Sequence, residues 1–359
     1  MKKNLIYLAV VIVLAILAWF FIFNQGTGSF GGDDKAFGVK DTASIGKIFL
    51  ADLSGNKIEV ERSGDGWVMD NGTPVRQEVM NTILLTFNQM EIKAPVAKSM
   101  FNKVIRDIAG NHIKVEVYTR GGKQIRSYFI GPIAANGRGN YMLVEGSKTP
   151  FELQIPGFDG FISSRFDMQV INWKDRTVFK YRPDNIAKLE VNYPRVPDSS
   201  FVIERSADGQ YTFINRSTDV RQFNPEIGNY YLNQFKRLNC ELYLDDKYKM
   251  DSLASQQPVC VMTVTDLDGN SRSAEVFYRP VSYRTKMQFT YEGKEINFDM
   301  DKYYAIINDG KDLSIIQNFV FGKLFIGPSY FYRQRGETPN VLIQDLMQDS
   351  EGETVDLME

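Results

Sequence analysis

The stretch E-R-S-G-D-G at positions 61–66 returns as E-R-S-A-D-G at positions 204–209, which is 143 positions later in a chain of 359 residues. The tripeptide V-R-Q at 75–77 returns at 220–222, which is 145 positions later. Matches that keep their order and nearly keep their spacing are the signature of an internal duplication. We therefore expect two copies of one structural unit.

The patterns around these matches predict what each copy contains. Residues 58–61 (I-E-V-E) and 113–117 (I-K-V-E-V) alternate apolar and polar side chains, as half-buried strands do. Asp-Gly and Gly-Gly pairs separate such runs and suit tight hairpins, which need a positive φ. After each V-R-Q, apolar residues follow at helical spacing: Leu84, Phe87 and Met90 in the first copy, and Leu232, Phe235 and Leu238 in the second. The sequence thus predicts an α+β fold, with an N-terminal transmembrane helix and two duplicated, mostly antiparallel sheet-plus-helix modules.

The composition divides the chain further. We expect a transmembrane anchor at 1–24, a flexible stalk at 25–43, a first α+β repeat at 44–175, a second α+β repeat at 184–327 and an acidic tail at 334–359. The linker between the repeats is expected near 173–184. The tail holds seven acidic residues and one basic residue, so we expect a disordered segment that is either simply solvated or docks on a partner.

The anchor is predicted from residues 5–23, a run of 19 residues without a charge. Such a run spans about 28 Å as a helix, which is close to the thickness of the bilayer hydrocarbon core. Lys2 and Lys3 precede it, so the positive-inside rule places the N-terminus in the cytoplasm and residues 24–359 on the far side of the membrane. A cleaved signal peptide is the competing interpretation, but the run is longer than a usual apolar signal region and ends in aromatic residues.

Composition also limits the chemistry. The net charge of −2 argues against nucleic acid as a partner. His112 is the only histidine, and Cys240 and Cys260 are the only cysteines, which excludes a Cys/His zinc cluster and an iron–sulfur cluster on four thiolates. We predict no catalytic residue, no cofactor site and no metal site.

Several short segments resemble functional motifs without meeting their requirements. The glycine-rich segments 26–31 and 131–140 lack the strand and helix that a phosphate loop needs, so we interpret them as stalk and hairpin loop. The acidic segment 266–270 has its glycine too early for a calcium loop and reads as a β-turn. His112 is interpreted as a surface or helix-capping residue.

Five residues remain as candidates for a specific role. Cys240 and Cys260 align with Ile92 and Ile113 of the first copy and are expected to face the core. They form either a disulfide or two buried thiols, and the sequence leaves both open. Arg76 and Arg221, in the two V-R-Q segments, and Arg138, in the glycine-rich loop, are candidate contacts for a partner or an anionic ligand. An ion pair at the strand–helix junction is the structural alternative for Arg76 and Arg221.

A set of core positions resembles a known bacterial family. The N-terminal K-K-N-L-I-Y opens the anchor, I-x-K-I stands at 45–48, and a hairpin leads to Gly66 and Trp67. An Arg-to-Leu helix at 76–85 and Y-M-L-V at 141–144 complete the set. Over roughly residues 1–325, these segments resemble the bacterial domain of unknown function 4340.

The resemblance implies a cellular context and carries no active-site residues. Its members are typically membrane-anchored and encoded beside ABC transporters of the gliding-motility type. The implied partners are a permease, an ATPase and a larger auxiliary membrane protein. The acidic tail is not a feature associated with the family.

Together these observations lead to two alternative functions. The first is a non-enzymatic accessory protein of the cell envelope, single-pass in the bacterial inner membrane with its bulk in the periplasm, associated with such a transporter. The second is a periplasmic ligand-binding module that takes up a lipid, peptide or glycan between its two repeats. A hydrolase using carboxylates alone would need two acids close together in a cleft, and nothing in the spacing of the acids indicates such a pair.

Overall fold

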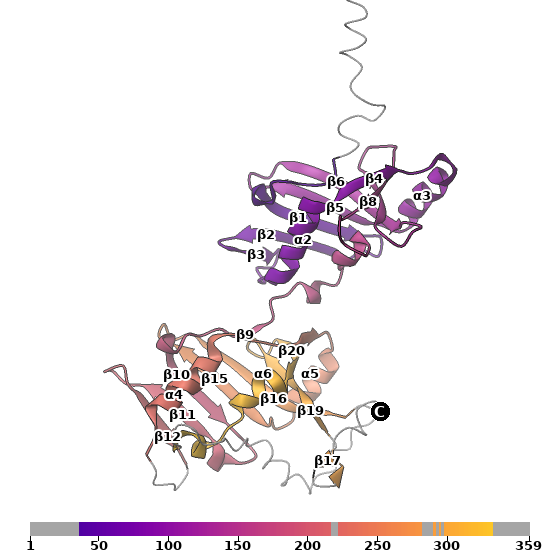
Figure 1. The fold of residues 1–359 in the computed structure, drawn as a ribbon. Helices are drawn as coiled ribbons and strands as arrows, with labels where there is room; N and C mark the ends of the chain where they lie inside the picture. Colours follow the sequence, from indigo (N-terminus) through magenta and orange to yellow (C-terminus); the bar gives the residue numbers. More distant parts are fainter. Residues whose placement is uncertain (1–35, 217–221, 282–289, 292–293, 296–297, 333–359) are drawn as a thin grey trace, which may run out of the picture. The chain divides into compact units, whose positions relative to one another are not determined.

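The computed structural model describes residues 36–216, 222–281, 290–291, 294–295 and 298–332. These residues form two compact units, which divide between Asp175 and Arg176 (Figure 1). The predicted anchor, Arg221 and the acidic tail lie outside the described residues. Within the described part, no helix is long and apolar enough to cross a membrane.

The first unit is built on one antiparallel sheet of eight strands with the order β3-β2-β1-β5-β6-β7-β8-β4. Its strands are β1 (Ile45–Asp52), β2 (Lys57–Ser63), β3 (Gly66–Met69), β4 (Glu91–Pro95), β5 (Ile113–Thr119), β6 (Gln124–Ile133), β7 (Asn140–Val144) and β8 (Phe151–Gln154). The helices are α2 (Gln77–Gln89) and α3 (Lys98–Gly110), and short 3-10 turns lie at Thr42–Ser44, Ile162–Arg165 and Val170–Asn172.

The second unit has a sheet of eight antiparallel strands in the order β12-β11-β10-β15-β16-β19-β20-β14. These strands are β10 (Ile186–Asn192), β11 (Phe201–Arg205), β12 (Tyr211–Asn215), β14 (Leu242–Leu244), β15 (Cys260–Asp266), β16 (Ser271–Pro280), β19 (Phe298–Ile307) and β20 (Asp312–Gln317). Two small pairs are β9 (Thr177–Phe179) with β13 (Leu238–Asn239), and β17 (Thr290–Tyr291) with β18 (Lys294–Glu295).

The helical segments of the second unit are short. They are α4 (Pro225–Leu232), α5 (Lys247–Ala254), α6 (Asn318–Phe321), and the 3-10 turns η5 (Pro183–Asn185), η6 (Pro197–Ser199), η7 (Asn233–Lys236), η8 (Gly322–Leu324) and η9 (Pro328–Tyr332). The predicted second helix is therefore broken: Leu232 ends α4, Phe235 lies in η7 and Leu238 in β13. All three side chains are nevertheless buried, as their spacing predicted.

The two sheets have the same strand order once each strand is matched by its place in the chain. The register agrees as well, because Lys47 pairs with Glu61 in the first unit and Lys188 pairs with Glu204 in the second. Each first strand also carries one unpaired extra residue after its opening isoleucine, Gly46 or Ala187. A shared bulge is a family-specific detail, so the units are repeats in backbone detail as well as in sequence. The α+β class with two antiparallel sheets is confirmed.

The segments that lead into the two sheets are held by matching bonds. The amide of Val39 donates to the carbonyl of Phe87 at 2.8 Å. In the second unit, the amide of Tyr181 donates to the carbonyl of Phe235, also at 2.8 Å. The sequence comparison paired the same two phenylalanines. These bonds tie each lead-in to the end of the helical segment that follows the third strand.

The hairpins that carry the repeated E-R-S motif differ by one residue. Four residues separate the paired Arg62 and Trp67, whereas five separate the paired Arg205 and Tyr211. This extra residue accounts for one of the two positions by which the spacing between matching motifs grows from 143 to 145. Positive φ is supplied by Gly64 in the first loop and by Gly209 in the second, so the first loop uses Gly64 where the sequence pattern pointed to Gly66.

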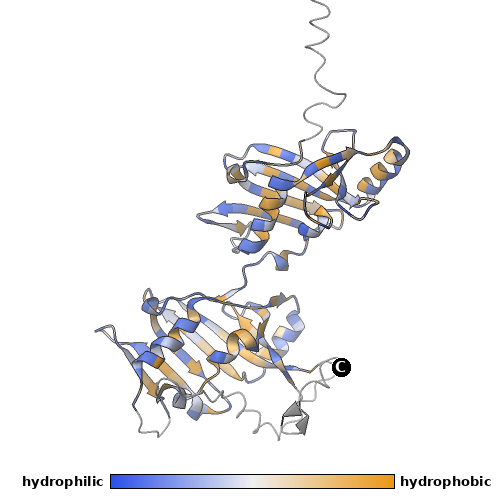
Figure 2. Ribbon diagram, viewed as in Figure 1, coloured by the Kyte–Doolittle hydropathy of each residue, from blue (hydrophilic) through white to orange (hydrophobic). Residues whose placement is uncertain are grey.

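Helices cover both faces of the first sheet. Met80, Ile83 and Phe87 of α2 pack in a cluster that includes Tyr128 and Ile130 of β6. Val104 and Ile108 of α3 pack in a second cluster, with Phe129, which lies between those two strand residues. Because successive side chains point to opposite faces of a strand, α2 and α3 cover opposite faces of the sheet. In Figure 2, apolar residues (orange) occur in the helices and in the strands of this unit.

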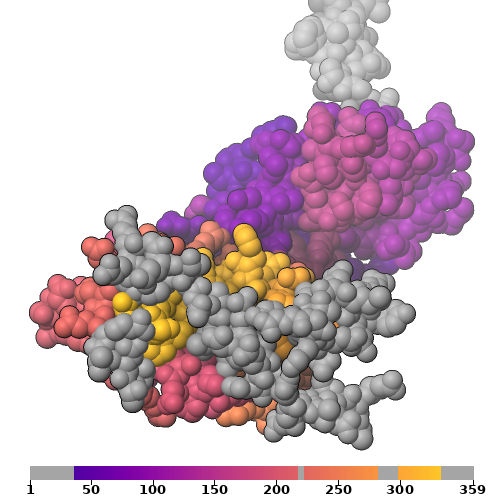
Figure 3. Space-filling model, turned by 60° about the horizontal axis from the view of Figure 1, so that its bottom comes forward, coloured from indigo at the N-terminus to yellow at the C-terminus, as the bar shows by residue number. Residues whose placement is uncertain are grey.

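The second unit closes its core with aromatic residues from the end of the described chain. Phe331 of η9 lies 4.9 Å from Phe201 and 5.3 Å from Tyr231, between ring centroids. The amide of Asn224, which caps α4, donates to the carbonyl of Phe331 at 2.8 Å. Figure 3 shows these last residues, in yellow, packed among earlier segments of the same unit.

Two details of the predicted organisation differ from the structure. Trp173, expected at the start of the linker, is fully buried in the first core, and its indole donates to the carbonyl of Asp167 at 2.7 Å. Phe179, expected in the same linker, is fully buried in β9 of the second unit.

Candidate functional site

The predicted contact residues lie at separate places in the fold. Arg76 is the N-cap residue of α2, and its amide donates to the carbonyl of Trp173 at 2.7 Å. Arg138 lies in the β6–β7 loop, and its guanidinium forms an exposed ion pair with Asp159 at 2.7 Å. β3, which precedes α2, and β6 are four strands apart in the sheet order, which is about 19 Å at the usual strand spacing. Arg76 and Arg138 therefore do not form one site.

The motif-like segments have local structural roles. The imidazole Nδ1 of His112 lies 2.8 Å from the carbonyl oxygen of Ile108, so this histidine caps the end of α3, as predicted. Asp266 accepts from the amides of Asp268 and Asn270 at 3.0 and 2.8 Å, which makes its segment the predicted β-turn. Among the described residues, no group of three or more His, Cys, Asp and Glu side chains could hold a metal ion.

Cys240 and Cys260 are both buried, and in the described part of the chain no disulfide joins them. Cys240 follows β13, and its amide donates to the carbonyl of Arg176 at 2.8 Å. Cys260 opens β15 in the middle of the large sheet and is fully buried. Burial raises the pKa of the Cys260 thiol, so little reactive thiolate is present at neutral pH.

We expect the native protein to react with a maleimide at neither cysteine, because the solvent does not reach Cys240 or Cys260. After unfolding in denaturant without a reductant, two maleimides per chain are expected. Mass spectrometry of the labelled protein measures both numbers. Unfolded protein that still takes up no label would contradict the structure and indicate a disulfide.

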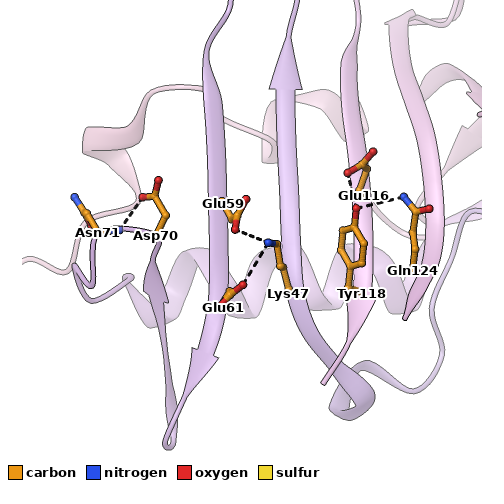
Figure 4. A network of polar contacts seen from close by, with 8 residues as sticks. All are labelled: Lys47, Glu59, Glu61, Asp70, Asn71, Glu116, Tyr118 and Gln124. Carbon is orange, nitrogen blue, oxygen red and sulfur yellow. Dashed lines mark hydrogen bonds and ion pairs between the residues drawn. The ribbon is translucent and has the colours of Figure 1, made fainter. Parts of the chain in front are cut away.

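A network of charged and polar side chains lies across neighbouring strands of the first sheet, among them β1, β2 and β5 (Figure 4). The ammonium of Lys47 in β1 binds Glu59 and lies 3.3 Å from Glu61, both in β2. Next to it, the hydroxyl of Tyr118 donates to Glu116 at 2.7 Å. Each charge in this network has a partner of opposite sign or a hydrogen bond, so the network stabilises the strand register and offers no unpaired charge to a ligand.

The network predicts a small, pH-dependent contribution from Lys47. Hydrogen bonding to Glu59 raises the pKa of Lys47 above the ordinary lysine value of 10.5. The stabilisation is therefore fully present below the unfolded-state pKa and is lost as pH rises through the folded-state pKa. We expect Lys47→Met to lower the free energy of unfolding of the first unit by about 0.5–1 kcal/mol at pH 7. Its difference from the wild type should vanish at strongly alkaline pH.

Urea unfolding followed by tryptophan fluorescence measures this difference, because Trp67 and Trp173 both lie in the first unit. Lys57→Met is the control, since Lys57 is an exposed residue of β2 on the same face as Glu59. A loss that stays constant up to high pH would mean that Lys47 acts through packing and not through its charge.

The candidate site is a hollow of about 420 Å³ on the second unit. Four segments form it: the lead-in turn η5 with the residue before it, the β11–β12 hairpin, α4 and η7. Its lining residues are Arg182, Pro183, Asp184, Arg205, Gly209, Tyr211, Asn229, Asn233 and Lys236. We call Arg182, Arg205 and Lys236 the basic corner.

Hydrogen bonds fix the rim of the hollow. The guanidinium of Arg182 donates twice to the Asp184 carboxylate, at 3.1 and 2.8 Å. Arg205 donates to the backbone carbonyl of Asp184 at 2.5 Å. The hydroxyl of Tyr211 donates to the carbonyl of Pro183, which joins the hairpin to η5. The rim is thus assembled before any ligand arrives.

The corresponding place in the first unit has different chemistry. Asp41 stands where Arg182 does, as the N-cap of the lead-in turn, and Asn88 stands where Lys236 does. The matching arginine, Arg62, lies 4.7 Å above the ring of Trp67 and donates to the carbonyl of Ile45 at 2.7 Å. Arg182, Arg205 and Lys236 thus line one hollow in the second unit. At the positions of Arg182 and Lys236, the first unit has an acidic and a neutral side chain.

The sequence patterns pointed to Arg205 as a repeated residue but missed Arg182 and Lys236. A signal was available in the repeat alignment, where the counterparts of Arg182 and Lys236 are acidic and neutral. Arg221, predicted as the second-copy counterpart of Arg76, lies outside the described residues.

Similarity to known proteins does not identify this chain. The resemblance to domain of unknown function 4340 therefore stays a prediction from the sequence segments that carry it. No family model, no curated protein and no solved structure matches this chain.

Proposed function

We propose that the chain is a non-enzymatic accessory protein, anchored in the bacterial inner membrane by residues 5–23. Residues 24–359 would stand in the periplasm and bind a membrane protein of an ABC transporter complex of the gliding-motility type. The uncharged N-terminal run supports the anchor, and the resemblance to domain of unknown function 4340 supports the transporter context. Neither feature needs the chain to carry out a reaction.

The observation that carries the binding function is an uncharged strand at the edge of the second sheet. β12 is an end strand of its sheet, and its sequence Y-T-F-I-N holds no charge. Ile214 in β12 is 54% exposed and gives this edge an apolar side chain at the surface. End strands offer unpaired backbone groups to a further strand. β12 therefore suits a partner that adds a strand beside it.

The edge of the first unit is built differently. β4 is an end strand that carries Lys93 and ends in Pro95. A charged side chain and a proline are devices by which proteins prevent edge pairing. β3, the counterpart of β12, is also an uncharged end strand, but the next segment is bonded to it, since the Val75 amide donates to the Trp67 carbonyl at 2.8 Å. These differences favour a docking role for the second unit.

The test is a tagged pull-down from mildly solubilised native membranes, with co-purifying proteins identified by mass spectrometry. We expect an ATPase and a permease with the wild type, and about tenfold less of both with Ile214→Lys, because the lysine interrupts an apolar contact at the edge. Leu53→Lys is the matched control, since Leu53 is 57% exposed in the β1–β2 turn of the first unit.

Two outcomes would contradict the proposal. A wild-type protein that elutes alone would remove the transporter partner and favour the alternative of a lipid, peptide or glycan ligand. Equal losses with Ile214→Lys and Leu53→Lys would mean that β12 is not the contact surface.

A further inference from the structure

The basic corner collects more hydrogen-bond donors than its own acceptors use. Its two guanidinium groups carry five N–H donors each and its ammonium three. The amides of Asn229 and Asn233 also line the hollow. The one carboxylate among the lining residues belongs to Asp184, and it accepts two hydrogen bonds from the Arg182 guanidinium. Among the described residues, the Arg205 guanidinium makes one hydrogen bond, to the Asp184 carbonyl, and the Lys236 ammonium makes none. Most of their donors are therefore available to a ligand.

The charge of the hollow is also unbalanced. Three cations and one carboxylate among its lining residues give a net charge of +2. Lys236 has no ion-pair partner among the described residues. Positive charge that lines a hollow raises the local concentration of anions. The arrangement therefore favours a ligand that carries about two negative charges.

The geometry of the donors favours phosphate over carboxylate. A carboxylate is satisfied by one guanidinium fork, as the bidentate Arg182–Asp184 pair shows. A phosphomonoester presents three acceptor oxygens in a tetrahedral arrangement and carries a charge of about −1.5 to −2 at pH 7. It can accept from three cations on different sides of the hollow at once. The basic corner offers cations from three segments, which are Arg182 before η5, Arg205 of β11 and Lys236 of η7.

The scaffold holds these three segments at fixed positions. Arg205 and Tyr211 connect the hairpin to η5 through the carbonyls of Asp184 and Pro183. The bond from the Tyr181 amide to the Phe235 carbonyl, at 2.8 Å, connects the same lead-in to η7. Binding would therefore require little ordering of the backbone, and preorganisation of this kind raises affinity.

We propose that the basic corner of the second unit is a binding site for the phosphate group of a small phosphomonoester or for free phosphate. The site does not depend on the proposed transporter partner, and it lies entirely within one unit. The hollow of about 420 Å³ leaves room beside a phosphate for a small organic group.

The test uses the purified full-length chain in detergent and isothermal titration calorimetry at constant ionic strength. Inorganic phosphate and glycerol 3-phosphate are the probes, and the tighter of the two identifies the source of the phosphate group. Succinate, a dicarboxylate, is the competing anion and is expected to bind at least tenfold more weakly. Raising the chloride concentration should weaken phosphate binding, because the cations are exposed.

Variants locate the site. We expect Arg182→Gln/Lys236→Gln to weaken phosphate binding about tenfold or more, since two of the three charge-assisted contacts are lost. Arg205 is left intact because it also holds the η5 turn. The control is Lys247→Gln/Lys311→Gln, which removes the same charge from two exposed lysines of the second unit. Unchanged melting temperatures of both double variants show that each still folds.

Three results would overturn the proposal. The first is that neither phosphate probe gives a heat of binding. The second is that succinate binds as tightly as phosphate. The third is that the control variant loses as much phosphate affinity as Arg182→Gln/Lys236→Gln. The last two would indicate a general attraction of anions to the positive charge of the unit. None of them bears on the pull-down, so the phosphate site and the transporter partner can fail separately.

Discussion

Gly139→Ala is expected to lower the free energy of unfolding of the first unit by about 3–5 kcal/mol, as the sum of backbone strain and steric overlap. Gly139 has φ of +79°, which an alanine adopts only with strain. A Cβ at this position would also overlap the backbone carbonyl of Leu153 in β8. The backbone cannot move away easily, because the Gly139 amide donates to the carbonyl of Gly160 at 2.9 Å.

Gly137→Ala is the matched control, because it separates strain from overlap. Gly137 lies in the same loop with φ of +73°, but nothing lies within 4 Å of its added Cβ. We expect a loss of about 1 kcal/mol from strain alone. Urea unfolding followed by the fluorescence of Trp67 and Trp173 reports the first unit in both variants. Equal losses in the two variants would show that the contact with Leu153 has no energetic weight.

This loop illustrates what the sequence could and could not predict. The segment 131–140 was interpreted as a hairpin loop, and it does connect the neighbouring strands β6 and β7. The close approach of Gly139 to Leu153 arises because β8 lies beside β7. That neighbourhood is a feature of the tertiary structure. Local patterns report which residues turn, but they do not report what lies opposite the turn.

The same distinction applies to the fold as a whole. The duplication and the alternating strands were predictable, because repeated motifs and side-chain alternation are properties of the sequence itself. The places of β4 and β14 at one edge of each sheet were not predictable, since β4 pairs with β8 and β14 with β20 across long stretches of chain. The short α4 follows from Pro225 and the Asn224 cap, which start the helix late, whereas Leu232, Phe235 and Leu238 kept the spacing of a longer one.

The basic corner was hidden for a related reason. Arg182 and Lys236 are 54 positions apart, and no motif joins them. They meet because η7 is bonded to the lead-in of β10 through Tyr181 and Phe235. Comparing the two repeats position by position exposes the site, since a duplicated scaffold keeps its apolar positions while its surface charges change. The charge reversal from Asp41 to Arg182 is the clearest such change.

Asp299→Ala is expected to lower the free energy of unfolding of the second unit by about 3–5 kcal/mol, the usual loss when one partner of a buried ion pair is removed. Asp299 is 3% exposed. Its carboxylate accepts from the guanidinium of Arg279 at 2.6 Å and from the amides of Asp301 and Lys302 at 2.9 and 3.2 Å. Alanine would leave a partly buried cation and two amides without their acceptor.

Two further variants divide this loss into its parts. Asp299→Asn keeps a side-chain oxygen for the two amides but removes the charge, so we expect an intermediate loss. Asp251→Ala removes one partner of the exposed Lys247–Asp251 pair, whose side chains are 79% and 61% exposed, and should cost less than about 1 kcal/mol. A loss at Asp299 as small as that at Asp251 would mean that the Arg279–Asp299 pair is hydrated and not buried.

The measurement exploits the uneven distribution of tryptophan. The three tryptophans are Trp19, Trp67 and Trp173, so residues 176–359 contain none. Asp299→Ala should therefore shift the unfolding transition seen by far-ultraviolet circular dichroism and leave the transition seen by tryptophan fluorescence in place. Gly139→Ala should shift the fluorescence transition instead. This opposite behaviour is expected because each variant lowers the stability of one unit. If the two transitions moved together in both variants, the repeats would unfold as one cooperative body.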